Sequence, residues 1–103
     1  MRKRKMLETH YRASRFCRVL GNPTVYQILQ LLKMSAHTPT ELAEKVGVSL
    51  KTISGTLRNM RQINLVRYEP QNKNKVYFLK DKLLPEVLLH IEKYVDKMRV
   101  QKW

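Results

Sequence analysis

Apolar residues in the first two thirds of the chain recur with a helical period. Spacings of three and four residues predict helices over residues 6–20, 23–34, 39–46 and 50–63. The first helix carries its stripe on one side, whereas the second is apolar on most sides and is therefore expected to lie at the centre of the core. In the fourth helix, Ile53, Leu57 and Met60 recur at i, i+4 and i+7, so this face is expected to point inward.

Local signals at the helix ends support these boundaries. Asn22 can cap the second helix, with Pro23 at its first position, and Thr38 and Glu41 have the spacing of a capping box. Ser49 is expected to cap the fourth helix. Three residues are expected to end helices, the first and last of them in the left-handed conformation: Gly21, Gly47 and Asn64.

After residue 64 the pattern changes from helical to alternating. Two strands are expected over 65–69 and 75–80, with Val76 and Phe78 on one face of the second, and a polar hairpin loop over 70–74. A last helix is expected over 84–101. The sequence therefore predicts one α+β, mainly α domain over residues 1–103. Its fold class is a winged helix-turn-helix, with the helix-turn-helix at 38–63, a two-stranded wing at 65–80, and terminal helices.

The outward face of the fourth helix is the candidate binding surface. With the apolar face turned inward, it contains no acid and no large apolar side chain: Lys51, Thr52, Gly55, Arg58, Asn59 and Gln62. Such a face suits a helix that enters the major groove of DNA. The wing adds basic and amide side chains expected to contact phosphates: Arg67, Asn72, Lys73, Asn74 and Lys75. Gly55 in a helix invites two interpretations, close approach to DNA or a neutral replacement.

The charge changes the picture of the partner. The net charge is +13, and 14 of the 21 basic residues lie in two blocks, 1–18 and 50–80, which hold one acid each. This distribution indicates a polyanionic partner, and double-stranded DNA fits it with the binding face described above. We expect no membrane partner, because no apolar run is long enough to span a bilayer, and a cytoplasmic location, because no signal peptide is evident. Residues 1–5 are expected to form a basic tail.

The terminal helices indicate a homodimer. The apolar residues of the last helix follow a 4-3-4-3 spacing, as in a helix–helix seam. Its inner half can alternatively pack within the same subunit. The expected dimer interface comprises residues of both terminal helices: Leu7, Tyr11, Leu84, Leu88, Ile91, Val95 and Met98.

Several short motifs resemble one family. Leu20-Gly21-Asn22-Pro23-Thr24 and the apolar run 28–32 are similar to the opening signature of ArsR-type winged helix-turn-helix regulators. The resemblance continues in register through Glu41-Leu42-Ala43, Val48-Ser49, Thr52-Ile53-Ser54, Leu57 and Leu65-Val66-Arg67, and covers about residues 15–80. It implies a dimeric DNA-binding regulator in which residues between Ser49 and Arg58 read the operator, which adds Ser54 and Thr56 to the recognition residues.

The chain departs from that family in ways that bear on metals. Metal-sensing members carry a Cys-x-Cys run where this chain has Thr40-Glu41-Leu42-Ala43-Glu44. Glu86 and His90 have the spacing of a second kind of metal site but lack a further ligand pair, so they are interpreted as a surface pair. We expect a non-metal-sensing member with no metal and no cofactor. The single Cys17 excludes an internal disulfide. It is expected to be a small core residue, and the alternatives are a redox sensor and an intersubunit contact.

The sequence bears on four classes of function. A sequence-specific transcriptional regulator, acting as a repressor, fits the polar recognition face. An architectural DNA-binding protein with little sequence preference fits the charge equally well. A module for RNA or protein is less favoured, because no exposed aromatic platform is evident. An enzyme, with catalytic residues, is not expected, because the three histidines are scattered and no phosphate-binding glycine loop is present.

Overall fold

The computed structural model describes residues 5–98, which form five helices and one hairpin. The elements, in chain order, are α1 (Glu8–Leu20), α2 (Pro23–Met34), α3 (Pro39–Val46), α4 (Leu50–Gln62), β1 (Val66–Gln71), β2 (Asn74–Leu79) and α5 (Leu83–Met98). The predicted fold class, mainly helical with a two-stranded wing, is confirmed. The basic tail predicted for residues 1–5 and the end of the last predicted helix, 99–101, lie mostly outside the described residues.

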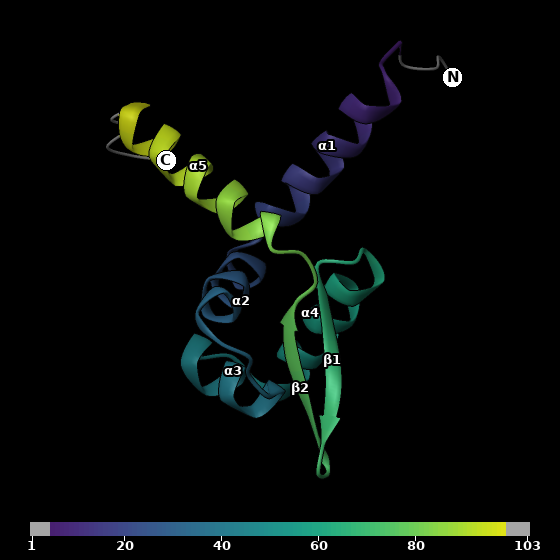
Figure 1. Ribbon diagram of the computed structural model, residues 1–103, viewed down its shortest axis with the longest axis vertical. Helices are drawn as coiled ribbons and strands as arrows, with labels where there is room; N and C mark the ends of the chain where they lie inside the picture. The colour runs from purple at the N-terminus through teal and green to yellow at the C-terminus, as the bar shows by residue number, and fades with distance from the viewer. Residues whose placement is uncertain (1–4, 99–103) are drawn as a thin grey trace.

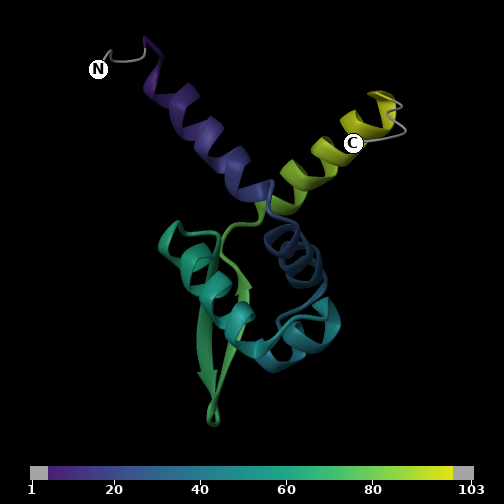
Figure 2. The same cartoon turned by 180° about the vertical axis from the view of Figure 1, so that it is seen from behind.

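A body and two arms make up the molecule (Figure 1). The body consists of α2, α3, α4 and the hairpin, whereas α1 and α5 leave it at one end and diverge from each other. The same arrangement is seen from behind in Figure 2. The tip of the hairpin points away from both arms, so the molecule has an arm end and a wing-tip end.

The core lies where α2 meets α3, α4 and the base of the hairpin. Ile28 and Leu29 of α2 are fully buried, which confirms the central place predicted for this helix. The predicted inward face of α4 is confirmed as well, since its three apolar residues are at most 1% exposed. The most deeply buried side chains come from the three helices of the body, from β1 and from α5: Ile28, Leu29, Leu42, Ile53, Leu57, Met60, Val66 and Leu88.

Most predicted helix ends are confirmed. The Asn22 side chain accepts hydrogen bonds from the backbone N–H groups of Thr24 and Val25, at 2.9 and 3.3 Å. The capping box of α3 is complete: Glu41 N–H donates to the Thr38 hydroxyl at 3.2 Å, and Thr38 N–H donates to the Glu41 carboxylate at 2.8 Å. These bonds occupy backbone donors that a helix start otherwise leaves free.

The backbone conformations predicted for the residues that end helices are confirmed in part. Asn64 is left-handed as predicted, with φ of 65°, and Gly47, which was expected only to end its helix, is left-handed as well, with φ of 84°. Gly21 is not: its φ is −70°, in the right-handed region, so the expected left-handed end of α1 is wrong. Backbone N–H groups of Gly21 and Asn22 bond to carbonyls of α1, which carries the chain into α2 without a left-handed residue.

The hairpin is longer, and its turn tighter, than predicted. β1 and β2 pair in antiparallel register from Val66↔Leu79 to Gln71↔Asn74, so the loop expected over 70–74 reduces to Asn72 and Lys73. Asn72 takes a left-handed φ of 57°, which permits this turn. Pro70 was expected to be in a loop, but it lies in β1, which is an edge strand and therefore tolerates a missing N–H.

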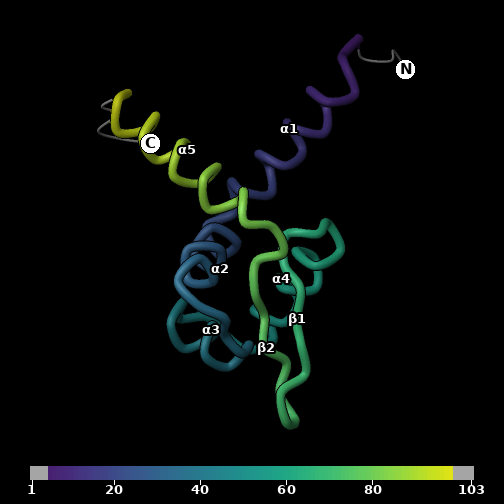
Figure 3. The backbone as a smooth tube through the Cα atoms, in the orientation of Figure 1, coloured from purple at the N-terminus to yellow at the C-terminus, as the bar shows by residue number. Residues whose placement is uncertain are grey.

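The other edge of the hairpin is joined to the segment between α2 and α3. His37 and Tyr77 exchange two backbone hydrogen bonds, of 3.1 and 2.8 Å, as an antiparallel bridge. This close approach of the α2–α3 segment to β2 can be followed in the tube of Figure 3. The bridge fixes β2 to the helical body, whereas the outer edge of β1 pairs with no other strand among residues 5–98.

Three residues on the arms are placed differently from expectation. Leu84 and Leu88 are 7% and 0% exposed and belong to the core of their own chain, so the inner half of the predicted seam packs within the subunit. Cys17 is exposed, and its interpretation as a core residue is wrong. Within residues 5–98, no helix is long and apolar enough to cross a membrane.

Candidate nucleic-acid interface

The outward face of α4 is exposed along its whole length. Lys51, Arg58, Asn59 and Gln62 lie on the surface, as predicted from the period, and none of their side chains takes part in a hydrogen bond among the described residues. The predicted recognition residues are exposed, with Thr56 half-buried: Lys51, Thr52, Ser54, Gly55, Thr56, Arg58, Asn59 and Gln62. Their donors are therefore largely available to a ligand.

The two threonines of this face are partly occupied within the helix. The Ser49 hydroxyl donates to the Thr52 hydroxyl at 2.9 Å and accepts from the Thr52 backbone N–H at 3.1 Å. The Thr56 hydroxyl donates to the Thr52 carbonyl at 2.8 Å. Because its donor is used, Thr56 offers a ligand only an acceptor, which makes it a weaker candidate for contacts to phosphates than its neighbours.

Packing among the described residues does not explain why position 55 is a glycine. A Cβ built on it would meet no atom within 4 Å, and its φ is not left-handed. Neither close packing nor backbone strain therefore requires a glycine at this position in the free protein. Both earlier interpretations of Gly55, close approach to DNA and a neutral replacement, stay predictions.

The wing divides its predicted contact residues between tip and base. Asn72 and Lys73 form the exposed tip, and Asn74 and Lys75 follow directly in β2. Arg67 pairs with Phe78 near the base of the hairpin, four residues before the Gln71↔Asn74 pair. At about 3.3 Å per residue, it lies some 13 Å from the end of the strand, so the structure does not bring Arg67 together with Lys73.

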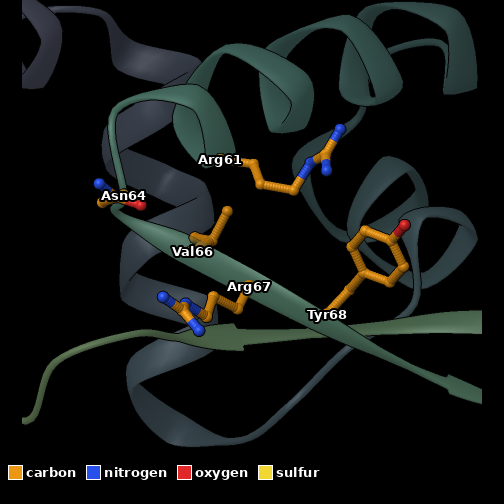
Figure 4. A pocket seen from close by; sticks show the side chains of 5 residues that line it. All are labelled: Arg61, Asn64, Val66, Arg67 and Tyr68. Atoms are coloured by element: carbon orange, nitrogen blue, oxygen red, sulfur yellow. The ribbon is translucent and has the colours of Figure 1, made fainter.

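A cluster of cations and tyrosines lies between α4 and the wing, and the sequence did not reveal it. The guanidinium carbon of Arg61 is 5.4 Å from the centre of the Tyr68 ring, and the Lys75 ammonium is 4.9 Å from it. The centres of the Tyr68 and Tyr77 rings are 5.3 Å apart. Figure 4 shows Arg61 and Tyr68 in a pocket of about 270 Å³, with the guanidinium of Arg67 directed away from them.

Two signals point to Arg61 in retrospect. It follows Arg58 by three residues, so both lie on the same flank of α4, and that flank faces the hairpin. Burial raises the pKa of Tyr77, and the positive charges of Arg61 and Arg58 oppose that rise, which places both guanidinium groups near this ring. Tyr77 is only 6% exposed, so its ring belongs to the core rather than to the surface.

A second hollow flanks α4 on the side of α1 and α2. It has a volume of about 390 Å³, and Asn59 and Gln62 of the recognition face line it together with Arg18 and Asn22. Asn59 therefore lies on the flank of α4 nearly opposite to Arg61, and Gln62 lies between the two flanks, on the outward side. The recognition face is bounded by the wing on one flank and by this hollow on the other.

At the opposite end, the arms expose apolar side chains. Leu7, Tyr11, Val95 and Met98 are 66%, 42%, 38% and 43% exposed, whereas Ile91 packs against its own core. The arms expose further large apolar residues that were not predicted for an interface: Met6, Leu83, Leu89 and Tyr94.

Hydrogen bonds to one carboxylate anchor α5 to the body. Glu92 accepts from the Tyr26 hydroxyl at 2.5 Å and from the Gln30 amide at 2.7 Å, both on α2. Burial, followed by this bond to Glu92, raises the pKa of Tyr26 to about 12. From Lys93 to Met98 every side chain is exposed, so Glu92 is the last residue that holds α5 against its own chain.

Within residues 5–98, no three histidine, cysteine or acidic side chains gather closely enough to hold a metal ion. His90 and Glu86 are both exposed on α5. His37 is buried and otherwise engaged: Nδ1 donates to the Ser35 carbonyl at 2.7 Å, and Nε2 accepts from Lys45 at 3.1 Å. None of these histidines forms a metal site with its described neighbours.

Comparison with known proteins finds one family model and several solved structures that are similar to this chain. The family model for a helix-turn-helix domain matches residues 20–69. No curated protein sequence matches the chain.

Solved structures match nearly the whole chain at low sequence identity. Rv0081 from Mycobacterium tuberculosis is 20% identical, with a TM-score of 0.84, over 90% of this chain and 94% of that one. A homodimeric winged helix-turn-helix DNA-binding domain from Mycobacterium bovis, described as a possible ArsR-family regulator, is 18% identical, with a TM-score of 0.77, over 93% of each chain. AntR, an antimony-specific transcriptional repressor, is 18% identical, with a TM-score of 0.76, over 93% of this chain and 88% of that one.

Proposed function

We propose that this chain, whose residues 20–69 belong to the helix-turn-helix domain family and whose fold is that of the ArsR-type winged helix-turn-helix regulators, binds double-stranded DNA in a sequence-specific way as a homodimer. One observation carries the proposal. The exposed, acid-free face of α4 lies beside the wing, while most of the exposed large apolar residues lie on or next to the two arms at the other end; the exceptions are Met34, Leu50 and Ile63. One end therefore suits a polyanion and the other suits a second copy.

The α4 face suits base edges as well as phosphates. Arg58 and Lys51 supply cations, and Asn59 and Gln62 supply amides that pair with bases. Residues 50–80 contain seven cations and one acid, so little in this segment repels a phosphate backbone. Lys73, at the wing tip, is placed to contact phosphates without reading sequence.

The arms support the homodimer. Side chains such as Leu7 and Met98 lose water contact only if another surface covers them. The relative from Mycobacterium bovis is itself described as homodimeric. Two copies joined through their arms would present two α4 helices to successive major grooves, about 34 Å apart.

A repressor is the regulatory role we propose. A dimer with two such faces covers its site on DNA and excludes other proteins from it, and no further activity is required. AntR is described as a transcriptional repressor, and its fold matches this one. We infer that the protein is not an enzyme and that it regulates transcription by occupying its DNA site.

Selection of bound duplexes from a random DNA library tests the proposal. We expect enrichment of an inverted repeat with half-sites about one helical turn apart. Tight binding without an enriched motif would instead identify an architectural DNA-binding protein, and no binding at all would refute the DNA-binding function. Titration of the selected duplex against salt then gives the number of phosphates contacted.

Variants separate the roles of the two contact surfaces. Arg58→Ala and Lys51→Ala are expected to weaken binding to the selected site by about 1–3 kcal/mol each and to reduce discrimination against scrambled duplexes. Lys73→Ala is expected to weaken binding to both duplexes alike. Lys93→Ala, on the α5 arm, is the matched control for loss of one charge and is expected to change neither. A selective loss of sequence preference in Lys73→Ala would contradict this division.

A further inference from the structure

We propose that Tyr68 is a positioning residue that holds Arg61 of α4 and Lys75 of β2 beside one aromatic ring, so that the recognition helix and the wing present one continuous track for a DNA phosphate backbone. The inference rests on the proposed DNA-binding function and assigns roles to two residues, Arg61 and Tyr68, that the sequence analysis left out. Tyr68 acts on DNA through the cations that it holds.

The geometry of the hairpin brings these groups together. Tyr68 lies directly opposite Tyr77, and Lys75 lies opposite Pro70, so all of them share the face of the hairpin that is turned toward α4. On this face the character changes from buried and apolar at Val66, through the two tyrosine rings, to an exposed cation at Lys75. Arg61 reaches the same ring from the helix, at 5.4 Å from its centre.

The charge of the cluster points to an anionic partner. Arg61 and Lys75 both lie within about 6 Å of one ring, the range in which a ring attracts a cation, yet the two cations repel each other. Glu69, the single acid of residues 50–80, is next to Tyr68 in β1, and alternation turns it to the opposite face. A phosphate close to this cluster is attracted by both cations, and its negative charge offsets their repulsion.

The ring itself is held in place. Its neighbour Tyr77 is buried, packs at 5.3 Å from it, and shares two backbone hydrogen bonds with His37. His37 is in turn fixed by its ring bonds to Ser35 and Lys45. Tyr68 is therefore a platform tied to the helical body, which reduces the freedom that Lys75 would lose on binding a phosphate.

A double-mutant cycle on DNA affinity tests the positioning role. Tyr68→Leu removes the ring and keeps bulk, Lys75→Ala removes one cation, and the third variant carries both changes. We expect Tyr68→Leu to weaken binding about three- to tenfold, equally for the selected and scrambled duplexes, because both cations lose the aromatic ring that holds them. Its salt slope is expected to stay that of the unmodified protein, whereas Lys75→Ala lowers the slope by about one.

The positioning role predicts that the effects of Tyr68→Leu and Lys75→Ala on DNA affinity are not additive. With Tyr68→Leu already present, Lys75→Ala is expected to weaken binding clearly less than it does alone. Tyr68→Phe, which keeps the ring, is expected to bind as the unmodified protein does. Strictly additive effects, or full affinity in Tyr68→Leu, would overturn the proposal. If the unmodified protein binds no duplex, the proposed function itself is refuted.

A second measurement needs no DNA and no variant that might fold poorly. A lysine held over an aromatic ring has its side-chain protons shifted upfield in NMR spectra by the ring current. We expect such a shift for the ε-methylene protons of Lys75 and none for those of Lys73, the exposed control at the wing tip. Equal shifts for the two lysines would show that Tyr68 does not hold Lys75 and would overturn the positioning role.

Discussion

Removal of the Tyr26 hydroxyl is expected to loosen α5 from the body of the domain. In Tyr26→Phe the ring stays and the bond to the Glu92 carboxylate is lost, while Gln30 still donates to Glu92. A hydrogen bond to a charged group contributes about 1.5–3 kcal/mol to stability. Because Tyr26 and Glu92 are only half-buried, solvent screens the interaction, and we expect a loss of about 1–1.5 kcal/mol in the free energy of unfolding.

Urea unfolding at neutral pH, at one fixed protein concentration, measures this loss. Tyr94→Phe is the matched control, because it removes a hydroxyl from an exposed tyrosine on α5 and is expected to leave the stability unchanged. Equal stability of Tyr26→Phe and the unmodified protein would refute the reasoning.

The same pair has a signature at high pH. The pKa of Tyr26 is raised from 10.0 to about 12 in the folded protein, so the stability linked to its proton is fully present below pH 10 and is lost as the pH rises toward 12. Tyr26→Phe has no such proton to lose. The difference in unfolding free energy between the two proteins is therefore expected to narrow from pH 10 to pH 12, and a difference that stays constant over this range would contradict the assigned bond.

Three further changes have expected outcomes that thermal or urea unfolding checks. Gly47→Ala is expected to destabilise the protein by about 1 kcal/mol, because its φ of 84° strains any residue with a Cβ, and an unchanged stability would contradict this. Gly55→Ala, in open space within α4, is expected to stabilise it by up to about 1 kcal/mol, and a loss of stability would show a constraint there. The hydrogen bond from the Thr38 backbone N–H holds the pKa of the Glu41 carboxyl below its usual value, so the stabilising effect of this bond is lost as the pH falls. Glu41→Gln is expected to weaken the acid dependence of stability, and an unaltered acid dependence would argue against the capping box.

The sequence predicted the helix starts because their causes are local. Asn22, Thr38 and Ser49 bond to backbone groups two or three residues away, so their positions follow from spacing alone. The same is true of the inward face of α4, which period alone determines. The left-handed conformation predicted for Gly21 was wrong, because a glycine permits this conformation without requiring it.

Features that depend on distant neighbours were not predicted. Pro70 reads as a loop residue until β1 is known to be an edge strand. Leu84 and Leu88 fit a dimer seam by spacing, and only the packing of the body assigns them to the core. Of the candidate site, the α4 face was foreseen, but the cluster of Arg61, Tyr68 and Lys75 depends on the register of the hairpin against α4.

The free edge of β1 bears on whether the protein aggregates at high concentration. An unpaired strand edge is a template onto which another chain can add its own strand, the first step of amyloid-like aggregation. Here the edge carries a gap in its row of donors at Pro70, and the exposed charges of Arg67 and Glu69 stand along it. An incoming strand would lose a hydrogen bond at Pro70 and meet charged groups. The exposed hairpin is therefore protected against aggregation with other copies of the chain through this edge.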